Sequence, residues 1–354
     1  ANLLYNNNNK KESSKYYKIL ADNLNYRGLF KYASMLDEGD GIIKNKIKYA
    51  HYFKLSADNG NPKSMYIYAN KLFKGEGVLT DKNGACNYYK RSANKGFVDA
   101  MITYGNILYD KDSLYFDPKN AAKYYEMAAK QGDDRGMTKY AMMLEKGIGV
   151  AANKSLAIDY YKKAIENGND EAMNNYALIL ETDESNPNNK TEASRYYKMS
   201  IEKGNAEAMF NYAYMLERGY DGNNKNNESA LKLYKMSSEK GNSKAMLYYA
   251  NLLKRCNPIT YDRKEVSHYY KMSADKGNAE AMFKYAQMLA TDQSVSGNKR
   301  ESIKYIKMAV ERQNIEAMYT YASILYNGYT GFILQNRKKA AELYKKSADS
   351  GHIE

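Results

Sequence analysis

The chain has 354 residues, 44% of them hydrophobic, and a formal net charge of +13. No apolar run approaches the ~20 residues that a membrane-spanning helix requires. The positive charge suits an acidic partner, nucleic acid or an anionic membrane surface through a salt-sensitive field. Because basic clusters seldom exceed two residues, lysines that solvate the outer sides of helices explain the charge more simply.

The first predicted element is the second half of a helix, because Ala1 to Tyr5 matches Ala250 to Lys254 later in the chain. A second helix is expected around Ser13 to Asn23. The last residues, Ser350 to Glu354, match the end of one repeat and the start of the next. We therefore expect the chain to be a piece of a longer protein.

From Asn25 onward, a unit of 36 residues recurs, with one step of 37 between Ala208 and Ala245. Such a period is typical of a repeat array. The first element of each unit, helix A, reads small-Met-x-x-Tyr-Ala-x-x-Leu, which places offsets 0, 1, 4, 5 and 8 on one helix face. Offset 0 is the small residue, namely Gly28, Ser64, Ala100, Gly136, Ala172, Ala208, Ala245, Ala281 and Ala317.

The second element, helix B, reads Ala-x-x-Tyr-Tyr-Lys-x-Ser/Ala-Ala-x-x-Gly, as in Ala85 to Gly96 and Ala121 to Gly132. Its closing glycine stands where a left-handed helix cap is expected. Each helix should be roughly 12 to 14 residues long, and stacked hairpins bury a stripe that a single hairpin leaves exposed. We expect the tyrosine pairs to pack in the core, with their hydroxyls reaching water or backbone.

The loop from helix A to helix B varies between repeats. Gly39 to Ile42, Gly75 to Val78 and Gly147 to Val150 share Gly-x-Gly-Ile/Val. No strand precedes this motif and no Gly-Lys-Ser/Thr follows it, so it predicts a turn and not a phosphate site. Insertions are expected at Tyr220 to Asn227 and Tyr329 to Asn336, in loops that could carry binding specificity.

These motifs resemble the Sel-one-like repeat family, relatives of the tetratricopeptide repeat, over essentially all of residues 1–354. Four loops depart from the family by lacking Gly-x-Gly. The resemblance implies an all-α fold, a single right-handed superhelical α-solenoid of about nine helix-turn-helix repeats. It also implies an adaptor or scaffold, whose repeats are not catalytic.

Residues for chemistry are scarce. His51 and His268 occupy the same place in helix B and are expected at the surface. The sequence holds no His-Glu-x-x-His, Cys-x-x-Cys or nucleophile elbow. We therefore predict no enzyme activity, no metal and no cofactor.

In the related tetratricopeptide groove, helix A lines the concave side, which implies that offsets −1, 2, 6, 9 and 10 face a partner. Exposed aromatic residues mark interfaces. Tight curvature that buries offset 2 against the next helix A is the alternative, and both stay open. The aromatic candidates are Phe30, Tyr66, Phe73, Tyr109, Phe210, Tyr214, Phe283, Tyr319 and Tyr326.

Offset −1 changes charge along the chain, from mainly basic to mainly acidic. This pattern suits an extended protein segment of opposite polarity, although helix N-termini favour Glu at this offset anyway. The charged candidates are Arg27, Lys63, Arg135, Glu171, Glu207, Glu280 and Glu316.

Cys86 and Cys256 lie nearly five repeats apart, so we expect no disulfide between them and a reducing, cytoplasmic compartment. The endoplasmic-reticulum lumen is the alternative, because glycosylation sequons begin at Asn153, Asn189 and Asn227 in predicted loops. We predict a non-catalytic scaffold whose concave helix A face binds a peptide or protein partner in a larger assembly. The alternatives are a basic nucleic-acid-binding solenoid and the regulatory repeats of a catalytic domain outside this segment.

Overall fold

The computed structural model describes residues 1–6, 9–186, 188–219, 225–256, 261–291, 299–328 and 333–352. The chain divides into two compact units, residues 1–172 and 173–354, and each is described by itself. The expected insertions at 220–227 and 329–336 lie partly outside the described residues, and the last two residues, 353 and 354, lie wholly outside them.

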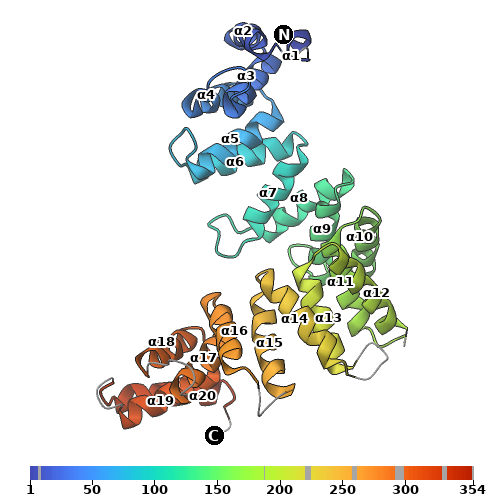
Figure 1. Cartoon of the computed structure of the whole chain (residues 1–354). Helices are drawn as coiled ribbons and strands as arrows, with labels where there is room; N and C mark the ends of the chain where they lie inside the picture. Colours follow the sequence, from blue (N-terminus) through green and yellow to red (C-terminus); the bar gives the residue numbers. More distant parts are fainter. Residues whose placement is uncertain are drawn as a thin grey trace. The chain divides into compact units, whose positions relative to one another are not determined.

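Helices alternate in type along the chain (Figure 1), odd numbers being helix A and even numbers helix B. The first unit contains α1 (Asn2–Asn6), α2 (Lys10–Asp22), α3 (Tyr26–Glu38), α4 (Lys46–Asp58), α5 (Pro62–Lys74), α6 (Lys82–Asn94), α7 (Val98–Tyr109), α8 (Pro118–Lys130), α9 (Asp134–Lys146) and α10 (Lys154–Glu166). The segment α11 (Asp170–Thr182) spans the boundary between the units. The second unit contains α12 (Asn189–Glu202), α13 (Ala206–Arg218), α14 (Asn227–Glu239), α15 (Ser243–Cys256), α16 (Arg263–Asp275), α17 (Ala279–Thr291), α18 (Lys299–Glu311), α19 (Ile315–Asn327) and α20 (Arg337–Asp349).

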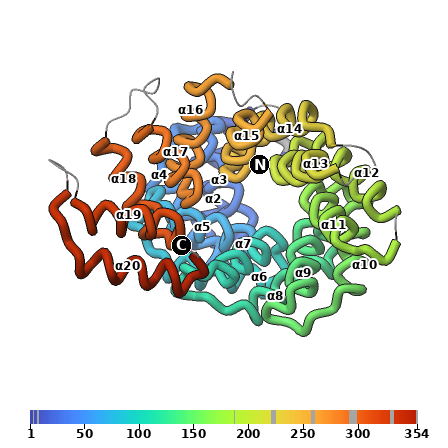
Figure 2. The backbone as a smooth tube through the Cα atoms, turned by 90° about the horizontal axis from the view of Figure 1, so that it is seen from below, coloured from blue at the N-terminus to red at the C-terminus, as the bar shows by residue number. Residues whose placement is uncertain are grey.

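Within each unit, neighbouring helices pack in serial order, from α1 to α10 and from α12 to α20. Figure 2 shows this order clearly along α13 to α16. The residues at offsets 0 and 5 are small and fully buried where the helices approach, as Ala208 and Ala213 are in α13. The described residues contain no β-strand, and the prediction of an all-α solenoid is confirmed.

The junction from helix B to the next helix A usually consists of a left-handed glycine and an asparagine cap, with Phe97 before α7 and Asp133 before α9 as exceptions to the asparagine. Gly204 has a φ of 88°, and the Asn205 side chain accepts a hydrogen bond from Ala208 N at 2.9 Å. The expected left-handed cap is confirmed at each closing glycine, from Gly60 to Gly351. Leu24 and Gln313 adopt the same conformation in two repeats that lack glycine there. The capping asparagines, such as Asn205, accept hydrogen bonds from backbone N–H groups in the first turn of helix A. Those N–H groups have no partner within the helix itself.

The two tyrosines of a helix B pair bond in different directions. In several repeats the first tyrosine donates to the end of the preceding helix B, as Tyr88 Oη does to Asp58 Oδ1 at 2.7 Å. The second is buried and donates to helix A of its own repeat, as Tyr89 Oη does to Asn70 Oδ1 at 2.8 Å. Packing of the pairs in the core is confirmed. The expectation that their hydroxyls reach water or backbone is wrong here, because side chains of neighbouring helices accept the bonds.

The acceptor of the second tyrosine comes from one of two positions on helix A. It is an asparagine at offset 6 for Tyr89, Tyr125 and Tyr270, namely Asn70, Asn106 and Asn251. It is a glutamate at offset 9 for Tyr161, Tyr197 and Tyr234, namely Glu145, Glu181 and Glu217. A buried hydroxyl needs a partner, and either position, one turn apart, brings an acceptor to the same ring.

Removing the hydroxyl of Tyr197 or Tyr234 should lower the free energy of unfolding of the second unit. The loss should depend on whether the acceptor glutamate keeps another hydrogen-bond donor. Tyr197→Phe removes a hydrogen-bond donor from Glu181, a carboxyl whose pKa is raised by burial despite nearby Arg218 and Lys190, and should cost about 1–3 kcal/mol. Tyr234→Phe should cost less, because Glu217 also accepts from Arg255 Nη2 at 2.6 Å. Urea unfolding of both variants measures the difference. Equal losses would contradict the role given to the acceptor.

Candidate binding surface

The A face is the surface formed by offsets −1, 2, 3, 6, 9 and 10 of the odd-numbered helices. Successive A helices meet along it, because offset 3 of one helix lies against offset 2 of the helix before. In the first unit, Thr103 Oγ1 lies 3.5 Å from Tyr66 Oη. In the second, Asn211 Nδ2 donates to Asn174 Oδ1 at 2.9 Å. Side chains from neighbouring repeats therefore form one continuous surface within each unit.

Offset 2 is more buried than an open binding position requires. Phe210 and Phe283 are 9% and 4% exposed, so both are core residues. Phe30, Tyr66 and Tyr319 are half-buried. The structure thus favours the alternative, burial against neighbouring helices, at the two phenylalanines. Replacing either by alanine would leave a cavity and lower stability, apart from any effect on a partner.

The aromatic candidates at offsets 6 and 9 are more accessible. Phe73 and Tyr326 are 45% and 48% exposed, whereas Tyr109 and Tyr214 are half-buried. A cation lies over several of these rings. Lys82 Nζ is 5.9 Å from the centre of the Phe73 ring, and the Arg337 guanidinium carbon is 5.6 Å from that of Tyr326.

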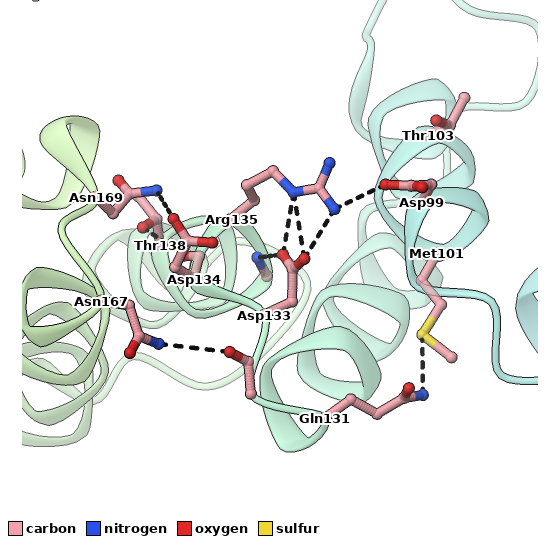
Figure 3. A network of polar contacts seen from close by, with 12 residues as sticks. Asp99, Met101, Thr103, Gln131, Asp133, Asp134, Arg135, Thr138, Asn167 and Asn169 are labelled. Carbon is pink, nitrogen blue, oxygen red and sulfur yellow. Dashed lines mark hydrogen bonds and ion pairs between the residues drawn. The ribbon is translucent and has the colours of Figure 1, made fainter.

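Part of the charged row at offset −1 is paired within the first unit. Arg135 Nη2 lies 2.8 Å from Asp99 Oδ1 and also 2.8 Å from Asp133 Oδ2, which ties the starts of α7 and α9 together (Figure 3). Glu171 accepts from Lys139 Nζ at 2.8 Å. Arg135 and Glu171 thus already stabilise contacts between repeats.

The remaining charged candidates are exposed. Arg27 bonds Tyr26 Oη at 2.8 Å, and Lys63 Nζ lies 5.4 Å from the centre of the Phe30 ring of the preceding repeat. Glu207, Glu280 and Glu316 are also exposed. These side chains are accessible to a partner.

The structure brings three acidic and aromatic candidates together in the second unit. Glu280, Phe283 and Glu316 line a hollow of about 990 Å³ at the starts of α17 and α19. Lys284 and Arg312 line it as well. The hollow therefore presents side chains of both signs of charge.

An aromatic and arginine cluster on α13 and α15 includes residues that the sequence reasoning missed. Tyr248, at offset 3, lies 5.2 Å from Phe210 and 5.7 Å from Tyr214, measured between ring centres. The Arg218 guanidinium carbon is 4.3 Å from the Tyr214 ring centre. The alignment of the repeats could have revealed this cluster, since it sets offset 3 beside offset 2 of the preceding helix A.

The groups that could support chemistry are dispersed. His51 and His268 are exposed on helices B, as predicted. Cys86 is a buried free cysteine in the first unit, and Cys256 is a half-buried free cysteine in the second. In the part of the chain that the structure describes, no group of three metal-ligating side chains occurs, and no helix is long and apolar enough to cross a membrane.

Two of the three sequons lie elsewhere than predicted. Asn189 and Asn227 are the first residues of α12 and α14 and not loop residues. Asn189 is buried, and its Nδ2 donates to Asp183 O at 3.1 Å, so in the folded chain this atom is engaged. Asn153 caps α10 and is exposed.

Stacked two-helix hairpins of constant length, with an extended A face, define a helical-repeat protein. A comparison with protein-family models matches the Sel1 repeat at residues 27–61, 62–97, 99–133, 134–169, 170–205, 206–242, 279–314 and 315–352. The chain therefore belongs to the Sel1 repeat family. Residues 243–278 fall between matches, yet α15 and α16 there form the same hairpin.

Solved structures agree with this fold. A protective antigen of uropathogenic Escherichia coli strains that displays an SLR fold has a TM-score of 0.68 and 22% identity, over 96% of this chain and 72% of that one. A Sel1 repeat protein from Oxalobacter formigenes has a TM-score of 0.57 and 21% identity, over 91% and 90%. At these identities the likeness concerns the fold. A search of curated protein sequences found no match.

Proposed function

We propose that the chain is a non-catalytic scaffold whose A face binds a peptide or protein partner in a larger assembly. The observation that carries this proposal is the cluster of Tyr214, Tyr248 and Arg218 on adjacent A helices. Tyrosine and arginine are the side chains that most often dominate binding energy at protein interfaces. Repeat arrays use such extended surfaces for binding.

The chemistry of the cluster suits a polypeptide. Tyr214 and Tyr248 are half-buried and present flat apolar area, and Arg218 and Arg255 are exposed beside them. Glu217 accepts a hydrogen bond from Arg255, which holds that guanidinium in place. A partner segment could pack on the rings and place carboxylates against the arginines.

A matched pair of double variants tests this proposal. Tyr214→Ala/Arg218→Ala removes a tyrosine and an arginine from the A face of α13. Tyr196→Ala/Arg195→Ala removes the same two side chains from helix α12, where Arg195 also lies over a tyrosine ring, at 4.8 Å. Peptides are first selected from a random library on the unmodified chain, and their affinities are then measured by calorimetry.

The A-face variant should weaken the selected peptides by about tenfold or more, and the helix B variant should leave them unchanged. Circular dichroism of both variants shows whether the fold is retained. Equal weakening by the two variants, or a selection that yields no peptide, would contradict a binding A face. Retention of the chain on immobilised nucleic acid, with affinity that falls steeply with salt, would instead favour the basic solenoid.

A further inference from the structure

Helix α18 departs from the repeat at one buried position. Ile306 is 5% exposed and stands where eight of the other B helices carry a tyrosine and α4 carries Phe53. Isoleucine has no ring and no hydroxyl, so it does not reach as far as a tyrosine does. The corresponding tyrosines are Tyr17, Tyr89, Tyr125, Tyr161, Tyr197, Tyr234, Tyr270 and Tyr344.

A pocket of about 250 Å³ lies beside Ile306, among α17, α18 and α19. Water occupies about 30 Å³ per molecule in the liquid, so the pocket is large enough for an organic group. Phe283, Ala286 and Ala290 supply apolar wall, and the polar or charged residues that line the pocket are Gln287, Thr291, Lys299, Ser302 and Thr320.

The walls of this pocket are the positions that surround a tyrosine ring in the other repeats. The Tyr234 ring lies 5.7 Å from the Phe210 ring, at offset 2, and 5.8 Å from the Tyr248 ring, at offset 3 of the next helix A. A Cβ on Gly105, at offset 5, would lie 2.6 Å from Tyr125 Cε1. In α17 and α19 the same offsets are filled by Phe283, Ala286 and Thr320, which all line the pocket.

The hydroxyl acceptors also have counterparts. Tyr125 Oη donates to Asn106 Oδ1 at 2.7 Å, from offset 6. In α17, offset 6 is Gln287, a longer amide with the same acceptor oxygen, and it lines the pocket. Offset 9, which supplies glutamate in other repeats, is Ala290, so that position adds space and no charge.

The geometry points to a receptor site for a phenol ring: a tyrosine side chain of a bound protein segment inserts beside Ile306 and donates its hydroxyl to Gln287. The pocket thus takes from a partner the side chain that eight other B helices supply themselves. This inference rests on the proposed function, because it assigns a side chain to the partner. It concerns one pocket, whereas the proposed function concerns the A face at α13 and α15.

The probe for this site is p-cresol, the side chain of tyrosine as a free molecule. Titrated into the full chain, it should shift the methyl NMR signals of Ile303, Ile306 and Ile324 in a saturable way. Toluene, which lacks the hydroxyl, should bind several-fold more weakly, because it gains no hydrogen bond to Gln287.

Two opposite substitutions complete the test. Ile306→Tyr should fill the pocket, raise the melting temperature and weaken p-cresol binding by at least about tenfold. Tyr270→Ile should open an equivalent pocket in the preceding repeat, beside Asn251, and add a second p-cresol site there. If Tyr270→Ile fails to fold, the p-cresol affinity of Ile306→Tyr tests the site on its own. This variant fills the pocket and opens no cavity, so it should stay folded.

Unchanged p-cresol affinity in Ile306→Tyr, or no shift of the pocket methyl signals, would overturn the receptor site. Equal affinity for toluene would overturn the hydrogen bond to Gln287. If p-cresol does not bind but selected peptides do bind at α13 and α15, the receptor site beside Ile306 is rejected and the proposed function stands. Saturable p-cresol binding in a chain that selects no peptide would remove only the scaffold proposal.

Discussion

Gly149→Ala should destabilise the first unit by about 3 kcal/mol or more, because both its backbone angle and its neighbour forbid a side chain. Gly149 ends the Gly-x-Gly turn after α9, with a φ of 69°. A Cβ there would lie 2.1 Å from the carbonyl oxygen of Pro118, at the start of α8 in the preceding repeat. The turn must therefore move away from α8.

Gly132→Ala is the matched control, since Gly132 also has a positive φ, 85°, but no described atom lies within 4 Å of its added Cβ. Only the conformational cost remains, about 1–2 kcal/mol. Urea unfolding gives both losses, and hydrogen exchange should show faster opening at the start of α8 in Gly149→Ala alone. Equal losses in both variants would show that the close approach to Pro118 contributes nothing.

Raising the pH above 10 should unfold the chain cooperatively, with half of the helical circular dichroism lost between about pH 10 and 12. Burial, and then hydrogen bonds to Asp22 and Asp58, raise the pKa of Tyr52 and Tyr88 to about 12. Burial also raises the pKa of Tyr197 and Tyr234, where neighbouring glutamates add to the effect. The folded chain thus holds protons that the unfolded chain releases near pH 10.

The direction follows from that difference. The pKa values in the folded state lie above the unfolded value, so these tyrosines contribute full stability below pH 10 and lose it as the pH rises through their folded pKa. Ultraviolet absorbance of tyrosinate should therefore rise together with the loss of helix. The chain in concentrated urea is the control, where ionisation should centre near pH 10. Ionisation of most tyrosines before any helix is lost would contradict the buried hydroxyl bonds.

Sequence reasoning predicted the hairpin, its boundaries and its caps because these are local features. The 36-residue period, the helical spacing of the apolar stripe and the closing glycines each depend on residues within one repeat. The structure confirms the hairpin and its closing glycine, for example in the left-handed Gly204 and in α13, the 13-residue helix that follows.

The binding surface was harder to predict, because burial on it depends on the neighbouring repeat. The sequence predicts an open aromatic row at offset 2, yet Phe283 is only 4% exposed. Offset 3 was assigned no role, yet it places Tyr248 against Phe210. A helical wheel drawn for one repeat shows neither the burial of Phe283 nor the contact between Tyr248 and Phe210, because both involve other helices.

The sequence by itself determined the class of fold, the length of each hairpin and the absence of a familiar catalytic motif. All three depend on the types and spacing of residues that are close together in the chain. Only the tertiary structure decided which tyrosine bonds which acceptor, that Phe210 and Phe283 belong to the core, and that a pocket opens beside Ile306. These outcomes depend on side chains from three helices at once, and a one-dimensional pattern records the spacing within a helix but not the distance between helices.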